Sequence, residues 1–100
     1  MDLHFTYSEL FLEYKTLLTK HQAEIFDFYY NCDLSLAEIS ELKNVSRQAV
    51  SDSLCKTREL LESYERSLRL LEKKRALIKL SSNFENSEYK DALLKMIGEL

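Results

Sequence analysis

The spacing of the apolar residues along the chain predicts helices from one end to the other. Between Leu10 and Leu18, large apolar side chains recur every three or four positions, which is the repeat of one helix face. Residues 20–30 hold aromatic and branched side chains on more than one face, as expected of a helix that is buried on most of its surface. Two core helices are therefore predicted within residues 1–34.

Polar residues indicate where three of the helices begin. A hydroxyl residue followed three positions later by Glu or Gln is the pattern of a capping box, and it occurs at Thr6, Thr19 and Ser35. The chain has no proline and one glycine, so it lacks the tight turns on which β-sheet domains depend. The predicted fold class is all-α, without the β-strands of a winged helix.

Residues 35–63 have the pattern of a helix-turn-helix. The apolar face of its first short helix consists of Leu36, Ile39 and Leu42. Asn44 tolerates the left-handed backbone conformation that commonly ends a helix, and Ser46 is a favourable N-cap for the helix that follows. The pattern is the one with which many DNA-binding proteins place a second helix in the major groove.

The second helix of this motif is predicted to continue as one long helix over residues 47–80. Its apolar positions alternate in spacing between four and three, which is a heptad pattern: Val50, Leu54, Thr57, Leu61, Tyr64, Leu68 and Leu71. Such a seam either packs within the chain or forms a homodimer, and the length of the helix beyond the motif favours the homodimer. A C-terminal helix is predicted over residues 84–100, with an inner face of Tyr89, Leu93, Met96, Ile97 and Leu100.

Charge is distributed unevenly along this chain, which has the length of a single domain, residues 1–100. In total 14 basic residues stand against 17 acidic ones, a net charge of −3. Residues 1–45 hold three lysines against eight acidic residues, residues 46–80 nine basic against five acidic, and residues 81–100 two against four. Positive charge is thus concentrated in the middle segment, and the flanking segments would repel a nucleic acid.

The first turns of the second helix hold the candidate DNA-binding residues. Arg47 can bind guanine with two hydrogen bonds, Gln48 can bind adenine in the same way, and Ser51 can reach a base or a phosphate. As N-cap, Ser46 leaves backbone N–H groups where a phosphate can bind, and Lys56 is a further phosphate contact. The alternative is that Arg47 and Gln48 are ordinary solvated residues of a first helical turn.

Other charged residues have simpler interpretations. Asp52 is expected to form an ion pair with Lys56, four positions on, rather than to read cytosine. The basic block at residues 73–75, with Lys79, is interpreted as the solvated end of a helix, where positive charge is favourable.

At these residues the chain resembles a known family. The stretch SLAEISELKNVSRQAVSDSLCKTRELL, residues 35–61, is similar to the helix-turn-helix of region 4 of bacterial sigma factors. It is more similar to the small YlxM-type proteins that are encoded beside signal-recognition-particle genes, whose motifs match SLAEI at 35–39 and VSRQAV at 45–50. The resemblance implies a nucleic-acid-binding role in transcription regulation, with a connection to the signal-recognition-particle pathway.

Several kinds of function are not indicated by the sequence. It has no glycine-rich phosphate loop and no Ser/His/Asp or Cys/His pairing, so neither an enzyme nor a bound cofactor is expected. His4 and His21 are isolated from other metal ligands, and Cys32 and Cys55 have no pairing pattern, so no metal site and no disulfide are expected. Without a signal peptide or a long apolar run, the predicted location is the cytoplasm.

Two hypotheses for function follow. The first is a regulatory DNA-binding protein that uses a helix-turn-helix similar to sigma region 4. The second is a non-enzymatic interaction module that binds the protein or the RNA of the signal recognition particle without reading a DNA sequence, and the acidic flanks favour it.

Overall fold

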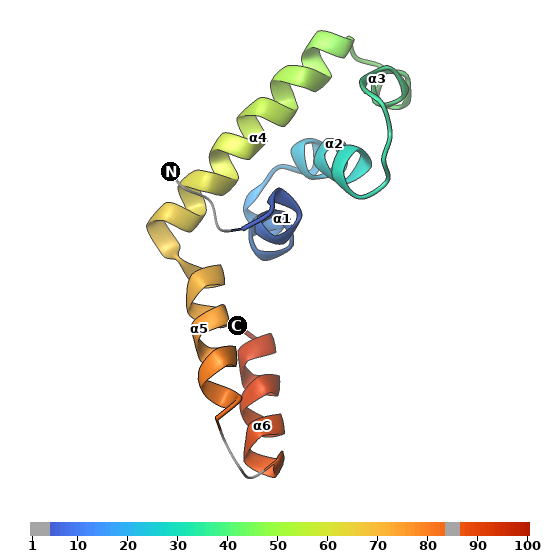
Figure 1. Ribbon diagram of the computed structural model, residues 1–100. Helices are drawn as coiled ribbons and strands as arrows, with labels where there is room; N and C mark the ends of the chain where they lie inside the picture. Colours follow the sequence, from blue (N-terminus) through green and yellow to red (C-terminus); the bar gives the residue numbers. More distant parts are fainter. Residues whose placement is uncertain (1–4, 84–86) are drawn as a thin grey trace. The chain divides into compact units, whose positions relative to one another are not determined.

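The computed structural model describes residues 5–83 and 87–100. Within these ranges all regular structure is helical (Figure 1). The elements are α1 (Tyr7–Tyr14), a 3₁₀ turn (Lys15–Leu17), α2 (Lys20–Tyr30), α3 (Leu36–Lys43), α4 (Arg47–Leu68), α5 (Leu70–Ser81) and α6 (Ser87–Gly98). The predicted all-α fold class is confirmed. The predicted start of the last helix, at residues 84–86, lies outside the described residues.

The capping residues begin the helices as predicted. The hydroxyl of Thr19 accepts from the backbone N–H of Gln22, whose side chain accepts in return from the N–H of Thr19, both at 3.1 Å. Ser35 and Glu38 form the same reciprocal pair at the start of α3. These bonds satisfy donors that the helices themselves leave without partners.

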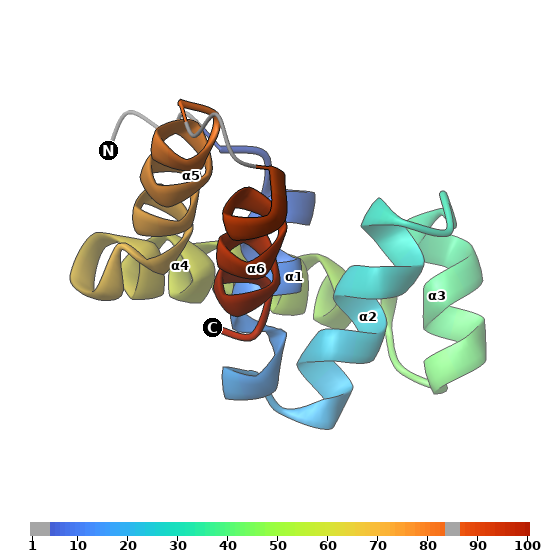
Figure 2. The same cartoon turned by 90° about the horizontal axis from the view of Figure 1, so that it is seen from below.

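The chain divides into two compact units, residues 1–67 and residues 68–100, which we call the N-terminal and C-terminal units. The N-terminal unit contains α1 to α3 and nearly all of α4, and in it α2 and α3 lie side by side (Figure 2). The C-terminal unit contains α5 and α6, which pack against each other. The prediction of one domain over residues 1–100 stays a prediction.

The core of the N-terminal unit is built from aromatic and branched side chains of all four helices. Phe26 stacks between Phe11 and Tyr30, with ring centroids 5.1 Å and 4.3 Å apart. Its buried apolar residues are Leu10, Phe11, Tyr14, Ile25, Phe26, Ile39, Val50, Leu54 and Leu61. The first positions of the heptad seam of α4 thus pack within the chain, so this part of the seam is not available to a partner. The homodimer stays a prediction.

Tyrosine hydroxyls join α1 to the second half of α4. Tyr7 donates to the carboxylate of Glu62, and the buried Tyr14 donates to the buried Glu65. A carboxylate buried next to apolar rings needs such a donor, because an unpaired buried charge is costly. These bonds hold the second half of α4 against α1.

The predicted continuous helix over residues 47–80 is wrong at one residue. α4 ends at Leu68 and α5 begins at Leu70, because Arg69 has a left-handed backbone, with φ 52° and ψ 31°. This conformation costs a non-glycine residue about 1–2 kcal/mol. We attribute the break to packing, since α4 is buried in the N-terminal unit whereas α5 packs against α6.

The C-terminal unit has a small core. Among its described residues, Ser81 and Ile97 are the buried ones. The predicted inner face of α6 is wrong for three of its members, because Tyr89, Met96 and Leu100 are 70%, 65% and 67% exposed. In a hairpin of two helices only one stripe of each helix faces the other, so the remaining apolar positions stay at the surface. Along the described ranges, the helices are too short or too polar to cross a membrane.

Candidate nucleic-acid interface

The turn between α3 and α4 has the geometry that the sequence predicts. Asn44 has φ 53° and ψ 48°, in the left-handed region, directly after Lys43. The N–H of Val45 then bonds back to the carbonyl of Ser40 at 3.0 Å, as at a helix end closed by a left-handed residue. The turn is therefore short and held by backbone bonds, which fixes the direction in which α4 leaves it.

Ser46 is the N-cap of α4, as predicted. Its hydroxyl accepts from the N–H of Ala49 at 3.0 Å, and its carbonyl accepts from the N–H of Val50 at 3.1 Å. The N–H groups of Arg47 and Gln48 precede the first bond within the helix, so they point out of its end. An N-terminus of this kind attracts anions such as phosphate.

The structure brings four of the five candidate residues to the start of α4. Ser46, Arg47 and Gln48 are exposed on the first turn, and Ser51 is half-buried one turn later. Lys56 is also exposed, but it follows Arg47 by nine positions, about two and a half helical turns. Lys56 therefore lies on the opposite side of α4 from Arg47, and the two side chains do not form one patch.

Gln48 has a partner that the sequence interpretation missed. Its side-chain amide donates to Asp52 at 2.8 Å, across one turn of α4. The expected pairing of Asp52 with Lys56 is wrong, because the nearest donor to this carboxylate is the amide and not the ammonium group. The spacing of four between Gln48 and Asp52 was visible in the sequence and is a known helix-stabilising pair.

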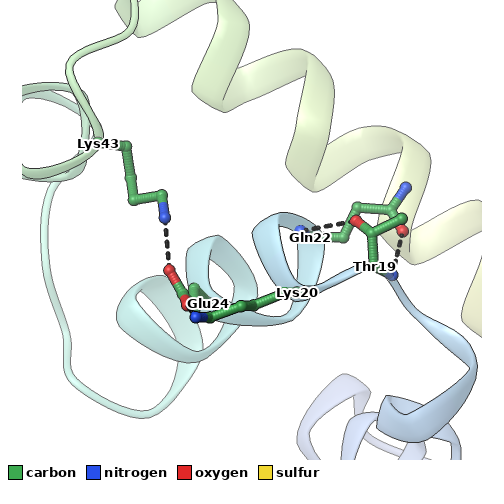
Figure 3. A network of polar contacts seen from close by, with 5 residues as sticks. All are labelled: Thr19, Lys20, Gln22, Glu24 and Lys43. Atoms are coloured by element: carbon green, nitrogen blue, oxygen red, sulfur yellow. Dashed lines mark hydrogen bonds and ion pairs between the residues drawn. The ribbon is translucent and has the colours of Figure 1, made fainter.

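Two cations beside the motif are engaged within the N-terminal unit. Lys43, at the end of α3, bonds to the carboxylate of Glu24 on α2, which also has Lys20 at 3.8 Å (Figure 3). The hydrogen bond from Lys43 lowers the pKa of Glu24 below its usual value. Arg58 is half-buried and donates to the hydroxyl of Tyr30 at 3.0 Å.

Arg47 and Lys56 differ from these two cations. Within the described part of the chain, neither of them forms an ion pair or a side-chain hydrogen bond, and both are exposed. The residues beside the helix-turn-helix thus offer two uncommitted positive charges. Arg47 alone has its charge at the end of α4 that leads into a groove in helix-turn-helix proteins.

Residues 1–99 match the model of a protein family described as "Putative helix-turn-helix protein, YlxM / p13 like". A UPF0122 protein of Mycoplasma capricolum is 46% identical over 81 residues, which cover 81% of this chain and 72% of that protein. UPF0122 proteins of Lactococcus lactis and Bacillus cereus are 39% and 40% identical over 95 and 94 residues, about nine tenths of this chain and 86% of each protein. Together with the helix-turn-helix geometry, these matches show that the chain belongs to the UPF0122 family of YlxM / p13-like proteins.

Proposed function

We propose that this protein is a cytoplasmic, non-enzymatic regulator that binds duplex DNA through the start of α4. The observation that supports this most directly is the first turn of α4, where Arg47 and Gln48 are exposed after a turn fixed by Asn44. In helix-turn-helix proteins this is the part of the second helix that reaches the base edges.

Each residue of this turn has a chemical role in the proposal. Arg47 binds the two acceptors of guanine, and Gln48 binds adenine once it leaves Asp52. The N-cap region at Ser46 binds a phosphate through backbone N–H groups. Ser51, which is half-buried, reaches a base or a sugar only at close approach. Lys56 lies on the opposite side of α4 from Arg47, so its role is to add positive charge near the phosphates rather than a contact in the same groove.

The experiment begins with selection of a preferred duplex from a random DNA pool by the full chain. Replacement of both Arg47→Ala and Gln48→Ala is expected to weaken binding of that duplex by about 30-fold or more, since two bidentate base contacts of about 1–3 kcal/mol each sum to about 2–6 kcal/mol. Fluorescence anisotropy measures the change, and circular dichroism checks that the helices remain. The matched control is Lys15→Ala with Thr16→Ala, two exposed neighbours in the 3₁₀ turn. Unchanged affinity of the first double variant would count against the proposal.

A second candidate function is an interaction module for the protein or the RNA of the signal recognition particle. The observation that favours it is the charge of the N-terminal unit, in which seven basic residues stand against twelve acidic ones. A surface of that sign repels a duplex laid broadly across it. The same assay with a structured RNA and with the particle's GTPase distinguishes the two. Tight binding of either, with no preferred duplex emerging from the pool, supports the second candidate.

A further inference from the structure

Positive charge is gathered on α5, outside the unit that holds the helix-turn-helix. The N-terminal unit has seven basic and twelve acidic residues, whereas the C-terminal unit has seven basic and five acidic. Five of those basic residues lie within residues 69–79, with Glu72 as the one acidic residue among them. The boundary between the two units is therefore also a boundary between a negative and a positive segment.

Some of these cations lie off the side of α5 that faces α6. The side of α5 that faces α6 is marked by its less exposed positions: Leu71, Lys74, Leu77 and Ser81. Lys73 and Lys79 lie off this stripe and are exposed, and within the described residues neither forms an ion pair. Arg69 is also exposed and only loosely paired, 4.0 Å from Glu72.

The helix dipole does not explain this arrangement. A helix favours positive charge in its last turn, which accounts for Lys79. Arg69 precedes the helix and Lys73 follows its first turn, close to the end where the dipole favours negative charge. The dipole thus accounts for neither of these two cations, and both can bind an anionic partner.

We propose that α5 is a second nucleic-acid contact, whose Arg69, Lys73 and Lys79 bind the backbone phosphates of duplex DNA. This rests on the proposed function. Residues 70–81 contain neither Asn nor Gln, the side chains that read bases most selectively besides Arg. Lysine is a flexible point charge suited to phosphates. The two lysines of this contact therefore add affinity without sequence preference, and they supply positive charge that the net-negative N-terminal unit lacks.

The test replaces Lys73→Gln and Lys79→Gln in the full chain and measures binding of the selected duplex between roughly 50 and 200 mM KCl, where phosphate contacts dominate the change in affinity. Each lost phosphate contact reduces the slope of log affinity against log salt by about 0.9, so the double variant is expected to lose about 1.8. Its preference for the selected duplex over a scrambled one stays unchanged. The control is Lys15→Gln with Lys95→Gln, which removes two exposed charges elsewhere and leaves the slope unchanged.

The outcomes separate this inference from the proposed function. A slope that does not change in the α5 variant overturns the inference, while a loss of preference in the Arg47→Ala, Gln48→Ala variant still supports the proposed function. Equal changes in the α5 variant and the control overturn the inference, because net charge alone then explains them. Loss of binding to a structured RNA but not to the duplex overturns the assignment to DNA. A wild-type chain that binds no duplex overturns both.

Discussion

Asn44 holds the turn of the helix-turn-helix in a conformation that most residues avoid. Its φ of 53° is tolerated by Gly and, among other residues, best by Asn. We expect Asn44→Gly to change the free energy of unfolding by a few tenths of a kcal/mol, whereas Asn44→Ala is expected to lower it by about 1 kcal/mol. Urea denaturation followed by circular dichroism measures both. Equal stability of the two variants would show that the turn adopts another conformation in solution.

Thr57 is a polar residue in the apolar seam of α4. Its side chain is fully buried, and its hydroxyl oxygen is the one buried side-chain polar atom in the described ranges without a hydrogen-bond partner. Valine has the same shape without the hydroxyl. Thr57→Val is therefore expected to raise the free energy of unfolding by about 1 kcal/mol. Thr16→Val, at an exposed position, is the control and is expected to change little. A destabilised Thr57→Val variant would mean that the hydroxyl has a partner.

At the scale of the elements, the contact between α1 and α4 predicts a dependence on alkaline pH. The hydrogen bond from Tyr7 to the Glu62 carboxylate raises the pKa of the Tyr7 hydroxyl to about 12. Because this value lies above the usual value of 10.0, the bond stabilises the fold below pH 10 and loses its effect as the pH rises through 12.

Tyr7→Phe removes this contribution. Its deficit in unfolding free energy relative to the wild type is expected to be largest below pH 10 and to shrink toward pH 12. Urea denaturation at a series of pH values measures the difference. Tyr29→Phe, which removes a hydroxyl from a more exposed ring, serves as control. A deficit for Tyr7→Phe that is constant with pH would contradict the assignment.

The elements could be predicted well where the signal is local. Thr19 and Ser35, with Gln and Glu three positions on, predict the starts of α2 and α3 correctly. The side chains that form the sequence pattern are the ones that form the capping hydrogen bonds. The break at Arg69 could not be predicted, since Arg carries no preference for the left-handed region. It depends on which partner each half of the helix finds, and that is tertiary information.

The position of the candidate site could be predicted from the sequence, but the ion pairs of the cations beside it could not. Ser46 as N-cap follows from its side chain and its place before the apolar pattern. The engagement of Lys43 by Glu24 joins residues nineteen positions apart, so no helical spacing reveals it. The sequence therefore indicates which side chains stand at the start of α4, but not which neighbouring cations are already neutralised.

At the scale of the whole molecule, the core is unequally divided between the two units. Among the described residues, every buried apolar side chain except Ile97 belongs to residues 1–67. A fragment of residues 1–67 is therefore expected to unfold cooperatively with heat. A peptide of residues 68–100 is expected to have low helicity, because helices of 12 residues are marginal alone and fewer than about 40 residues rarely bury enough surface.

Circular dichroism as a function of temperature measures the helicity and the unfolding of the fragment of residues 1–67 and of the peptide of residues 68–100. A cooperative thermal transition of the C-terminal peptide at micromolar concentration would contradict the expectation. If that transition shifted with peptide concentration, it would point to association of the peptide and would support the predicted homodimer, with α5 and α6 rather than the buried seam of α4 as its surface.

The hydrogen bond between Gln48 and Asp52 has a consequence for selectivity. Any base that takes the Gln48 amide must first displace the Asp52 carboxylate, at a cost of about 0.2–0.5 kcal/mol for an exposed pair four positions apart on a helix. Adenine offers two partners to the amide and can outweigh that loss, whereas a single acceptor only replaces what was there. Asp52 is then an internal competitor for the Gln48 amide: in the proposed complex adenine gains one bond over it and a base with a single acceptor gains none, so Gln48 would leave Asp52 only for adenine.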